Sequence, residues 1–574
     1  MIIGIDLGTT NSLVSIWQDG SSTLIPNALG SVLTPSVVSI DKDGQILIGQ
    51  TAKERLVSSP EVTASAFKRF MGSQKVYQLG KHRFSPEELS ALILKSLKHD
   101  AENHLGHEVR DAVITVPAYF NDHQREATKT AAILAGLNVV RLVNEPTVAA
   151  MAYGLHSQDT DSERKFLVLD LGGGTFDVTL LELFCGVMEV KASAGDNFLG
   201  GEDFTHAIMH GFIQEQHRKH SKDKDFWQAH NAKLYDLAEN AKRTLSDGHT
   251  ATLKLTVDST EYEYTLNSDD FATLCQPLLE RFALPIERAV RDAGLKVREL
   301  DAVVMVGGAT RMPLFKNFVT KLLGRFATAG LNPDEAIALG AGIQAGLIME
   351  DSALEELVLT DVAPYSLGVE TTVRISEHER RSGIFAPVIE RNTIIPTSKV
   401  EEFSPINDDQ KSVDFGIYQG EARLVSDNIK LGEISVAVPH DYRGRASELS
   451  IKVRFSYDVN GLLEVDIDTG DKNKQYNLTI ENGAKRLNTK EIQASKDKLY
   501  ALKIHPRDTI ANRTLLARAE RLYAQRLGHD REELGRLIAW FENLLDSQDP
   551  NKIRHESPKF SSWLDEIEHR DDWL

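Results

Sequence analysis

The chain has 574 residues, of which 41% are hydrophobic and 26% are charged, and its 65 basic and 84 acidic residues give a net charge of −19. This composition is typical of a soluble globular protein with room for about four domain-sized units, rather than of a disordered chain. The negative charge disfavours general binding of nucleic acid, and the sequence contains no run of ~20 apolar residues that would span a bilayer.

The two cysteines, Cys185 and Cys275, form neither a disulfide framework nor a C-x-x-C pair. This usage fits a reducing compartment and disfavours a zinc site built on thiolates. Near the N-terminus, Asp6 interrupts the apolar run too early for the apolar region of a signal peptide. We therefore expect a cytoplasmic protein.

Up to about residue 350, short β-branched runs alternate with longer helical stretches, which predicts an α/β unit. The predicted strands include residues 1–5, 112–116, 166–169 and 302–306. The segment 340–346 resembles a dinucleotide-binding glycine pattern but lies inside a helical stretch, so it indicates close helix packing. The pattern G-x-x-x-x-G-K-[ST] does not occur, which excludes a Walker-type ATPase.

A Gly/Thr turn at residues 6–11 joins the first strand to a second predicted strand at residues 12–17. Gly8 allows the backbone to approach a ligand closely, while Thr9 and Thr10 offer N–H and hydroxyl donors to phosphate oxygens. Alone, this turn is weak evidence, because many hairpins contain Gly-Thr.

The same strand–turn–strand arrangement occurs again around residues 170–177. Two such hairpins would hold a polyphosphate from opposite sides, and each begins with a carboxylate, Asp6 or Asp170, placed to hold a magnesium ion through its waters. A third glycine-rich turn, at residues 306–313, follows another predicted strand. It would accept a nucleoside, because its two glycines have no side chain to block a flat base.

From about residue 362 to about residue 480 the sequence changes to alternating apolar and polar residues broken by turn signals, which predicts antiparallel β-structure. The clearest predicted hairpin spans residues 451–467. After residue 488 the spacing becomes helical. An apolar stripe at residues 534–541 is expected to pack against another helix or against the β unit.

Between the first two regions lies the segment 354–361, which contains Leu357, Val358 and Leu359. A hinge is usually polar and rich in Gly, Pro or Ser, so this apolar connection suggests a segment that docks in one state. An edge strand that begins early is the simpler alternative.

The motifs of the first 340 residues, taken in order, resemble the 70-kDa heat-shock protein (DnaK) chaperone family, whose ATPase domain belongs to the actin and sugar-kinase superfamily. The matching segments are residues 4–12, 113–122, 144–147, 170–177, 199–204, 306–313 and 332–336. Each is weak alone, but together they are highly specific.

This resemblance implies a multidomain fold. An actin-like α/β nucleotide-binding domain, with the duplicated ribonuclease H-like fold, is expected at residues 1–352. A linker would follow at residues 353–362, an antiparallel β-sandwich that binds peptide at residues 363–486, and an α-helical lid at residues 487–574.

The resemblance also implies the catalytic residues. Lys68 matches the lysine that faces the γ-phosphate and offsets the charge on the transferred phosphoryl group. Glu145 and Thr175 match residues near the attacking water, and Asp177 lies in the same pocket. One of these carboxylates would orient the water. Without the order of the motifs, Lys68 would be taken for a solvated surface lysine.

The nucleotide-binding positions that match the family are Asp6, Gly8, Thr9, Thr10, Asn11, Gly172, Gly173, Gly174, Thr175, Gly201, Glu202, Glu239, Lys242, Arg243, Ser246, Gly307, Gly308, Arg311 and Asp334. Asp6 and Asp170 would hold Mg²⁺ through water, and ATP or ADP would be the nucleotide. In this arrangement Lys242 and Arg243 would frame the base. Without the motifs, an exposed helix face would be expected at residues 239–243.

Coupling residues carry over in the same way. Pro117 and Arg125 match the pair that couples nucleotide state to the other domain, although Pro117 alone would indicate only the end of a strand. Arg141, Asn144 and Asp361 match positions where a J-domain cochaperone and the linker meet the ATPase domain. The apolar linker thereby acquires a purpose.

The β unit resembles the family's substrate-binding sandwich, in which an extended peptide binds through backbone hydrogen bonds and places one apolar side chain in a pocket. The matching positions are Val369, Thr372, Phe403, Ile406, Val413, Phe415 and Ile451. Core packing is an alternative, because both interpretations require apolar residues. Since Phe415 is bulkier than the usual aliphatic residue, a narrower or shifted client preference is expected.

Three shortened regions resemble the specialised bacterial branch called HscC rather than the general DnaK. They lie between residues 72 and 85, between residues 246 and 271, and after residue 489. The second removes a segment that helps to engage the usual nucleotide-exchange factor, so dependence on that factor is in doubt. A truncated lid is expected to let bound peptide escape faster.

Together these features predict an ATP-dependent molecular chaperone of protein folding and the stress response. Its partners would be unfolded or extended client peptides and a J-domain cochaperone, with neither nucleic acid nor membrane. A small-molecule kinase of the actin and sugar-kinase superfamily is the alternative, which would explain the phosphate loops but neither the β unit nor the linker. A cytomotive filament protein is a third possibility, disfavoured by the long C-terminal extension.

Overall fold

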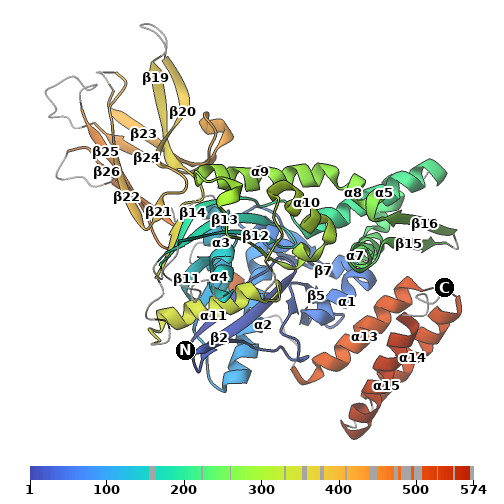
Figure 1. The fold of residues 1–574 in the computed structure, drawn as a ribbon. Coiled ribbons are helices and arrows are strands. Elements are labelled where there is room, and N and C mark those ends of the chain that lie inside the picture. The colour runs from blue at the N-terminus through green and yellow to red at the C-terminus, as the bar shows by residue number, and fades with distance from the viewer. Residues whose placement is uncertain are drawn as a thin grey trace.

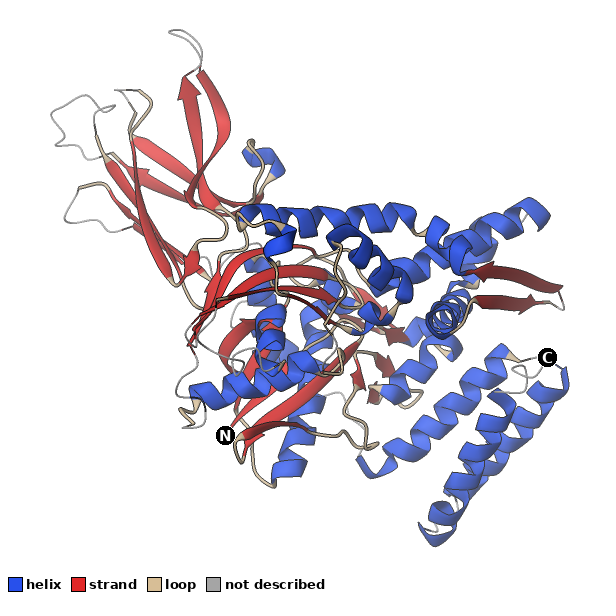
Figure 2. Cartoon of the chain, in the orientation of Figure 1, coloured by secondary structure: helices blue, strands red, loops and turns tan. Residues whose placement is uncertain are grey.

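The computed structural model describes the chain apart from residues 154–162, 185–186, 221–223, 259, 329–330, 352–353, 355–357, 375–379, 408–409, 439–448, 471–475, 480–492, 497–498, 500–506, 527, 547–549 and 569–574. A large part made of sheets and helices comes first, an all-β part follows it, and helices form the C-terminal end (Figures 1 and 2).

The first part is built on two six-stranded sheets that repeat one local pattern. In each, an antiparallel hairpin, β1–β2 or β12–β13, lies beside a parallel neighbour, β10 or β17. The first sheet has the order β11-β10-β1-β2-β3, with β4 beside β2, and the second has the order β17-β12-β13-β14-β18-β21. Mixed sheets flanked by helices are the α/β architecture that the sequence predicts.

The strands of the first sheet are β1 (Ile2–Asp6), β2 (Asn11–Gln18), β3 (Ser21–Leu24), β4 (Thr34–Pro35), β10 (Asp111–Val116) and β11 (Asn138–Asn144). Those of the second are β12 (Arg164–Leu171), β13 (Phe176–Phe184), β14 (Val187–Asp196), β17 (Ala302–Val306), β18 (Val358–Val362) and β21 (Ile394–Ile395). Smaller sheets contain β5 (Val38–Ile40), β6 (Ile46–Ile48), β7 (Thr63–Ala64), β8 (Tyr77–Leu79), β9 (His82–Phe84), β15 (Thr250–Val257) and β16 (Thr260–Asn267).

Helices α4 (Glu145–Ala152) and α11 (Ala336–Ile348) share one apolar cluster with strands from both sheets. A Cβ atom on Gly340 would lie 1.9 Å from the carbonyl oxygen of Val148 on α4, so only glycine allows this approach. The segment 340–346 therefore lies in a packed helix, as the sequence predicts. The other helices of this part are α1 (Gln50–Ser58), α2 (Pro86–Leu105), α3 (Asp122–Leu134), α5 (Gly201–His220), α6 (Lys224–Ala229), α7 (Asn231–Asp247), α8 (Ser268–Leu274), α9 (Gln276–Asp292) and α10 (Pro313–Leu323).

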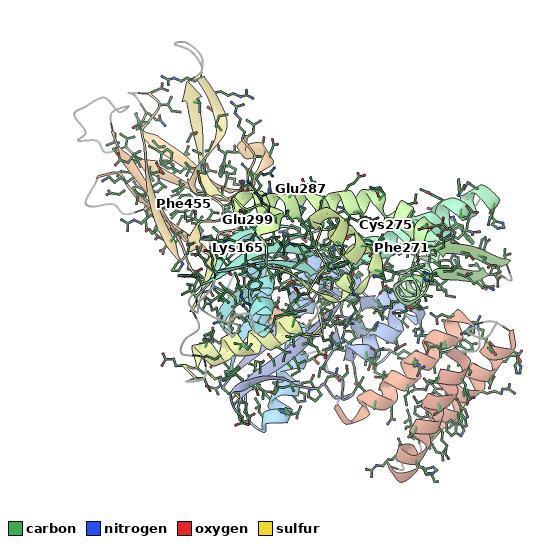
Figure 3. All side chains as sticks on the ribbon, in the orientation of Figure 1. Lys165, Phe271, Cys275, Glu287, Glu299 and Phe455 are labelled. Atoms are coloured by element: carbon green, nitrogen blue, oxygen red, sulfur yellow. The ribbon has the colours of Figure 1, made fainter. Side chains whose placement is uncertain are left out.

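The all-β part consists of two four-stranded antiparallel sheets, β20-β19-β23-β24 and β22-β25-β26-β27. One apolar cluster joins them, because Val369 and Ile417 from the first sheet share it with Val453 and Phe455 from the second (Figure 3). We call this part the sandwich. Its strands are β19 (Leu367–Arg374), β20 (Arg380–Ile389), β22 (Thr397–Phe403), β23 (Ser412–Gln419), β24 (Ile429–Ala437), β25 (Ile451–Tyr457), β26 (Leu463–Asp468) and β27 (Tyr476–Thr479).

Helices α13 (Arg507–Gln525), α14 (Gly528–Asp546) and α15 (Pro550–Glu568) form a unit that we call the C-terminal bundle. The predicted apolar stripe of α14 packs on the other two helices, and the rings of Phe541 and Phe560 stack with centroids 4.1 Å apart. The bundle lies against α1, where Thr51 Oγ1 is 2.6 Å from Thr514 Oγ1. Within the described parts of the chain, every helix is too short or too polar to cross a lipid bilayer.

The described part of the apolar connection forms strand β18. It pairs in parallel with β14, where Val358 is opposite Val187, and its C-terminal end pairs with β21. The segment thus docks at the edge of the second sheet, which satisfies both the docking hypothesis and the edge-strand alternative. Leu357 lies outside the described residues.

Cys275 is free and buried beside Phe271 (Figure 3), whose carbonyl oxygen accepts a hydrogen bond from Cys275 N (3.0 Å). Burial raises the pKa of its thiol to about 12. The thiol is therefore unreactive at neutral pH. Cys185 lies outside the described residues.

Candidate nucleotide site and its contacts with the sandwich

The α/β part has two halves, one built on the first sheet and one on the second. The two predicted phosphate-binding turns lie against each other where these halves meet. A Cβ atom on Gly173 would lie 1.9 Å from Thr10 Oγ1, and one on Gly174 would lie 2.6 Å from Arg69 Cγ. Gly201 N donates to Gly172 O (2.9 Å), which places the start of α5 beside them. The other predicted residues of the turns, Gly8, Thr9, Asn11 and Thr175, are buried or half-buried.

Carboxylates gather beneath these turns around one lysine. Lys68 Nζ lies 2.7 Å from Glu145 Oε1, and both side chains are buried. Burial and the neighbouring Glu145 raise the pKa values of Asp6 and Asp177 to about 7 and raise that of Asp170 well above its usual range. The protein alone therefore supplies too little positive charge here for all four carboxylates to ionise.

The unpartnered atoms of this cluster fit a hydrated cation and a phosphate. Asp170 Oδ2 and Asp177 Oδ2 are buried and have no hydrogen-bond partner in the protein, although such groups are normally satisfied. Among the described residues, no three His, Cys, Asp or Glu side chains are placed to ligate a metal directly. Carboxylate oxygens are nonetheless the groups that bind Mg²⁺, directly or through its waters.

The adenosine positions predicted on α7 form one charged cluster. Burial alone would raise the pKa of Glu239, but Lys242 Nζ (2.6 Å), the Thr205 hydroxyl (2.7 Å) and Arg243 Nε (3.0 Å) lower it to about 2. Lys242 is nearly enclosed, whereas the Arg243 side chain is 60% exposed. Arg243 is therefore accessible to a ligand, whereas Lys242 is largely covered. Ser246 donates to the Lys242 carbonyl (3.1 Å).

The third glycine-rich turn adjoins this cluster. Gly307 has φ of +82°, and a Cβ atom there would lie 2.3 Å from Leu171 O, so this position requires glycine. A Cβ atom on Gly308 would lie 2.4 Å from Asp334 Oδ1. Arg311, whose side chain is 53% exposed, pairs with Asp334 over 2.8 Å. Arg311 is therefore a second largely exposed arginine, located at this turn.

Sequence reasoning missed Arg69, which crosses between the two halves. It follows Lys68 directly and contacts Asp203 (3.0 Å) and Glu202 (3.4 Å) at the start of α5. Burial raises the pKa of Glu202 to about 7, and Arg69 acts in the opposite direction. The sequence carried only one signal for this role, the position of Arg69 next to Lys68.

A hydrogen-bonded path leads from the carboxylates to the sandwich. Tyr119 N donates to Asp177 Oδ1 (2.9 Å), and the hydroxyl of Tyr365 donates to Tyr119 O (3.0 Å). The two tyrosine rings also lie with their centroids 4.2 Å apart. Nearby, Arg391 of the sandwich pairs with Asp292 of α9 over 2.7 Å. Sequence reasoning missed this path, because both tyrosines lie in segments that resemble the family but neither was assigned a role.

The predicted coupling residue Arg125 lies at the centre of a second set of contacts. Its guanidinium, almost completely buried, donates to Asn144 Oδ1 (2.7 Å), Ala118 O (3.2 Å) and Asn460 O (3.4 Å). Asn144 Nδ2 in turn donates to Asp361 Oδ2 in β18 (2.8 Å). The structure thus joins three predicted residues to each other and to the turn between β25 and β26.

The other two predicted coupling residues lie close by. Pro117 directly follows β10, and Arg141 lies on the neighbouring strand β11. Burial lowers the pKa of Arg141, while Asp361 acts against this shift. Next to Arg141, Leu142 N donates to Asn460 Oδ1 (3.1 Å). The turn between β25 and β26 therefore contacts β11 through the Asn460 side chain and α3 through the Asn460 carbonyl oxygen.

Asp122, at the start of α3, is a buried carboxyl group that contacts the sandwich. Its Oδ1 accepts hydrogen bonds from the Tyr457 hydroxyl (3.2 Å) and from Gln419 Nε2 (3.2 Å), while its Oδ2 has no partner. Burial raises its pKa to about 7, Arg125 acts in the opposite direction, and Asp458 adds to the rise.

We expect contact between α3 and the sandwich to weaken as the pH rises. In contact, Asp122 has a pKa of about 7, whereas a separated, hydrated Asp122 would have its ordinary value of 3.8. The state in which α3 contacts the sandwich therefore binds more protons. The resulting stabilisation of the contact is complete below pH 3.8 and is lost as the pH rises to about 7. From pH 6 to pH 8 the equilibrium should shift by about tenfold toward separation.

Small-angle X-ray scattering in ATP, at pH 6, 7 and 8, would measure this equilibrium through the radius of gyration. Asp122→Asn is the matched control, and it should remove most of the pH dependence. His123, which contacts Lys430 O across the same surface, has a pKa lowered by burial and therefore acts in the opposite direction below about pH 6.5. Equal pH dependence in both proteins would contradict the prediction.

The predicted peptide-groove residues lie in or beside the core of the sandwich. Val369, Phe415 and Ile451 are buried, and the Phe403 and Phe415 rings meet edge to face with centroids 5.8 Å apart. Val413 packs against the same cluster. Of the remaining two positions, Ile406 is 41% exposed and the Thr372 hydroxyl lies 2.9 Å from Ser382 Oγ. The two aromatic rings therefore pack together among the predicted groove residues.

One comparison with protein families covers nearly the whole chain. The family model described as Hsp70 protein matches residues 2–78 and 74–570. The match includes the α/β part, the sandwich and the C-terminal bundle alike.

Proposed function

The chain belongs to the Hsp70 family, whose members are ATPases and chaperones, and on this premise we propose that it is an ATP-dependent chaperone for extended apolar peptide segments. Residues 1–352 would bind and hydrolyse ATP, residues 353–362 would be the linker, residues 363–486 would bind the client, and residues 487–574 would form a lid. The observation that carries this proposal is the hydrogen-bonded path from Asp177 through Tyr119 to Tyr365 of the sandwich.

Hydrolysis would take place at the carboxylate cluster. Lys68, held beside Glu145, would offset the charge that develops on the transferred phosphoryl group. One oxygen of Asp177 is fixed by a backbone N–H, and its unpartnered Oδ2 would accept a hydrogen bond from the attacking water and orient it. Magnesium, when bound through water to Asp6 and Asp170, would neutralise part of the phosphate charge.

The nucleotide would be held at both of its ends. The turns around Thr10 and Gly173 offer backbone and hydroxyl donors to the phosphates. On the adenosine side, the exposed faces of Arg243 and Arg311 would lie against the base, with Glu239 fixing the orientation of α7. These roles agree with the exposure of the two arginines and with the ion pairs of Glu239.

ATP would weaken client binding, and the client would speed hydrolysis. Thermodynamic linkage requires the binding half of this relation to be reciprocal. Its physical support is the set of contacts made by Arg125, Asn144 and Asp361, which joins the α/β part to β18 and to the sandwich. A ligand that separates these parts must break those hydrogen bonds.

A J-domain cochaperone would bind beside β18, near Arg141 and Asn144. Within the Hsp70 family, we assign the chain to the HscC branch. The short connection between α7, which ends at Asp247, and β15, which begins at Thr250, supports this assignment. That connection offers no long insertion for the usual exchange factor. A cytoplasmic location completes the proposal.

The client would be an extended segment that pairs with the backbone of the sandwich. Phe403 and Phe415 pack against each other at predicted groove positions, so a large client side chain that entered between them would have to displace one of the rings. We therefore infer a preference for segments whose central side chain is small enough to fit beside the aromatic pair, or apolar enough to repay its movement.

Single-turnover hydrolysis of ATP with Mg²⁺, with and without an extended leucine-rich peptide, tests the function. We expect the peptide to stimulate hydrolysis about fivefold, which corresponds to a coupling of ~1 kcal/mol. The control is the same peptide with each leucine replaced by aspartate, which should have no effect. Hydrolysis that ignores every peptide would contradict the coupled chaperone, and phosphoryl transfer to an added sugar would favour the kinase alternative.

A further inference from the structure

One face of α13 contacts two helices that belong to different halves of the α/β part. Arg521 Nε donates to Glu54 Oε2 of α1 (2.6 Å), and Gln525 Nε2 donates to Asp236 Oδ2 of α7 (2.7 Å). The two α13 residues are four positions apart and so share a helix face, and Arg521 Nη1 donates to Gln525 Oε1 (3.2 Å). A continuous chain of hydrogen bonds therefore runs from α1 through the C-terminal bundle to α7.

Helices α1 and α7 belong to different halves of the α/β part, and they also contact each other directly at the edge of the proposed nucleotide cleft. α1 packs against β5, β6 and β7, on the side of the first sheet, whereas α7 packs against α5 and β15, on the side of the second. Figure 1 shows the bundle beside both helices. Asp236 also lies about one turn before Glu239, so a contact at Asp236 acts on the helix that carries the proposed adenosine residues.

The Glu54–Arg521 end of this chain of hydrogen bonds is buried, whereas Gln525 and Asp236 are half-buried. Glu54 is 7% exposed, and the Arg521 side chain is 14% exposed. Arg521 Nη2 also donates to Glu568 Oε1 of α15 (2.6 Å), which ties the guanidinium to the rest of the bundle. Burial raises the pKa of Asp236, and Arg521 acts against this rise. Breaking such a contact leaves buried polar groups without partners, which costs more than breaking an exposed one.

We propose that the C-terminal bundle, docked in this way, clasps both rims of the nucleotide cleft and slows nucleotide release, so that nucleotide exchange is controlled from within the chain. Release requires the two halves to part, and parting requires the Glu54–Arg521–Gln525–Asp236 chain to break at one of its links. The inference rests on the proposed function, since it places a nucleotide between the halves. It gives the bundle a second task besides covering a client.

Release of a non-hydrolysable, ribose-labelled ATP analogue from the full-length protein tests this inference, with an excess of unlabelled ATP added by stopped flow. Gln525→Ala removes the link to α7, together with the hydrogen bond from Arg521 Nη1 within α13, and should speed release about threefold to tenfold. Gln525→Glu places a carboxylate beside Asp236 and should speed release further. The double variant Gln525→Ala with Asp236→Ala should release the analogue no faster than the faster single variant, because both changes break the same link.

Arg513→Ala is the matched control on the same helix. Arg513 contacts Asp41 (3.4 Å), on the α1 side alone, so its loss weakens bundle docking without cutting the link across the cleft. It should change release by less than Gln525→Ala does. Normal binding with unchanged release in the Gln525 variants would overturn the clasp while leaving the proposed function intact. Absence of binding to the unaltered protein would overturn both.

Discussion

Lys68→Ala should lower the single-turnover rate of ATP hydrolysis by about 10²- to 10³-fold while leaving nucleotide binding largely intact. Removal of one group that stabilises developing charge has an effect of this size in enzymes. Lys68 is the cation at the centre of the carboxylate cluster, and its Nζ lies 2.7 Å from Glu145. Because the phosphate-binding turns do not depend on this side chain, affinity for ATP should fall much less than the rate.

The same substitution leaves Glu145 buried without its partner, so part of any loss could reflect a weakened fold. Thermal unfolding separates the two effects, and Lys68→Met keeps the side-chain volume. Lys75→Ala is the matched control, since this lysine lies on the same segment but packs over the Phe70 ring at 3.3 Å instead of entering the cluster. Hydrolysis within twofold of the unaltered protein, in a folded Lys68 variant, would contradict the assignment.

The elements that the sequence predicts best are those with strong local patterns. The turns at residues 6–11 and 170–177 follow apolar strands and contain glycine where a Cβ atom would collide, and the structure brings both to one place. The alternation at residues 451–467 predicts the β25–β26 hairpin for a similar reason. The constraint at Gly8 and in the hairpin acts on neighbouring residues, so one sequence is enough to reveal it, whereas Gly173 and Gly174 are constrained by the distant Thr10 and Arg69.

The contacts between separate parts of the chain could not be predicted from local sequence patterns. Tyr365, Tyr457 and Gln525 are ordinary residues in their local sequences, and their roles arise from partners hundreds of positions away, such as Asp122 for Tyr457. Periodicity carries no information about such pairs. Family resemblance located Arg125 and Asp361, which also join parts of the chain, but it assigned no role to these three residues.

The apolar segment before the sandwich illustrates the boundary between these two classes. Its composition alone indicated that it docks, because three apolar residues in a solvated hinge would be costly. The place of docking, beside β14, depends on an open sheet edge that the local sequence does not reveal. Composition can thus show that a segment has a partner without showing which partner it has.

Arg125→Ala should abolish the stimulation of hydrolysis by peptide, so that the ratio of rates with and without peptide falls to about one. The substitution leaves Asn144 Oδ1 and Ala118 O without their donor, and each buried acceptor left unsatisfied costs about 1–3 kcal/mol. This loss is comparable to a typical coupling free energy between two sites, which is about 1–3 kcal/mol. Single-turnover hydrolysis over a range of peptide concentrations measures the ratio.

The partner on the sandwich side makes the prediction specific. Asn460 accepts from Arg125 through its carbonyl and from Leu142 N through its side chain, so Asn460→Ala should reduce stimulation only in part. Arg110→Ala is the matched control, because Arg110 is an exposed arginine whose pair with Glu108 contributes little. Full stimulation in a folded Arg125→Ala variant would contradict the prediction, and Tyr365→Leu would then test the path through Tyr119.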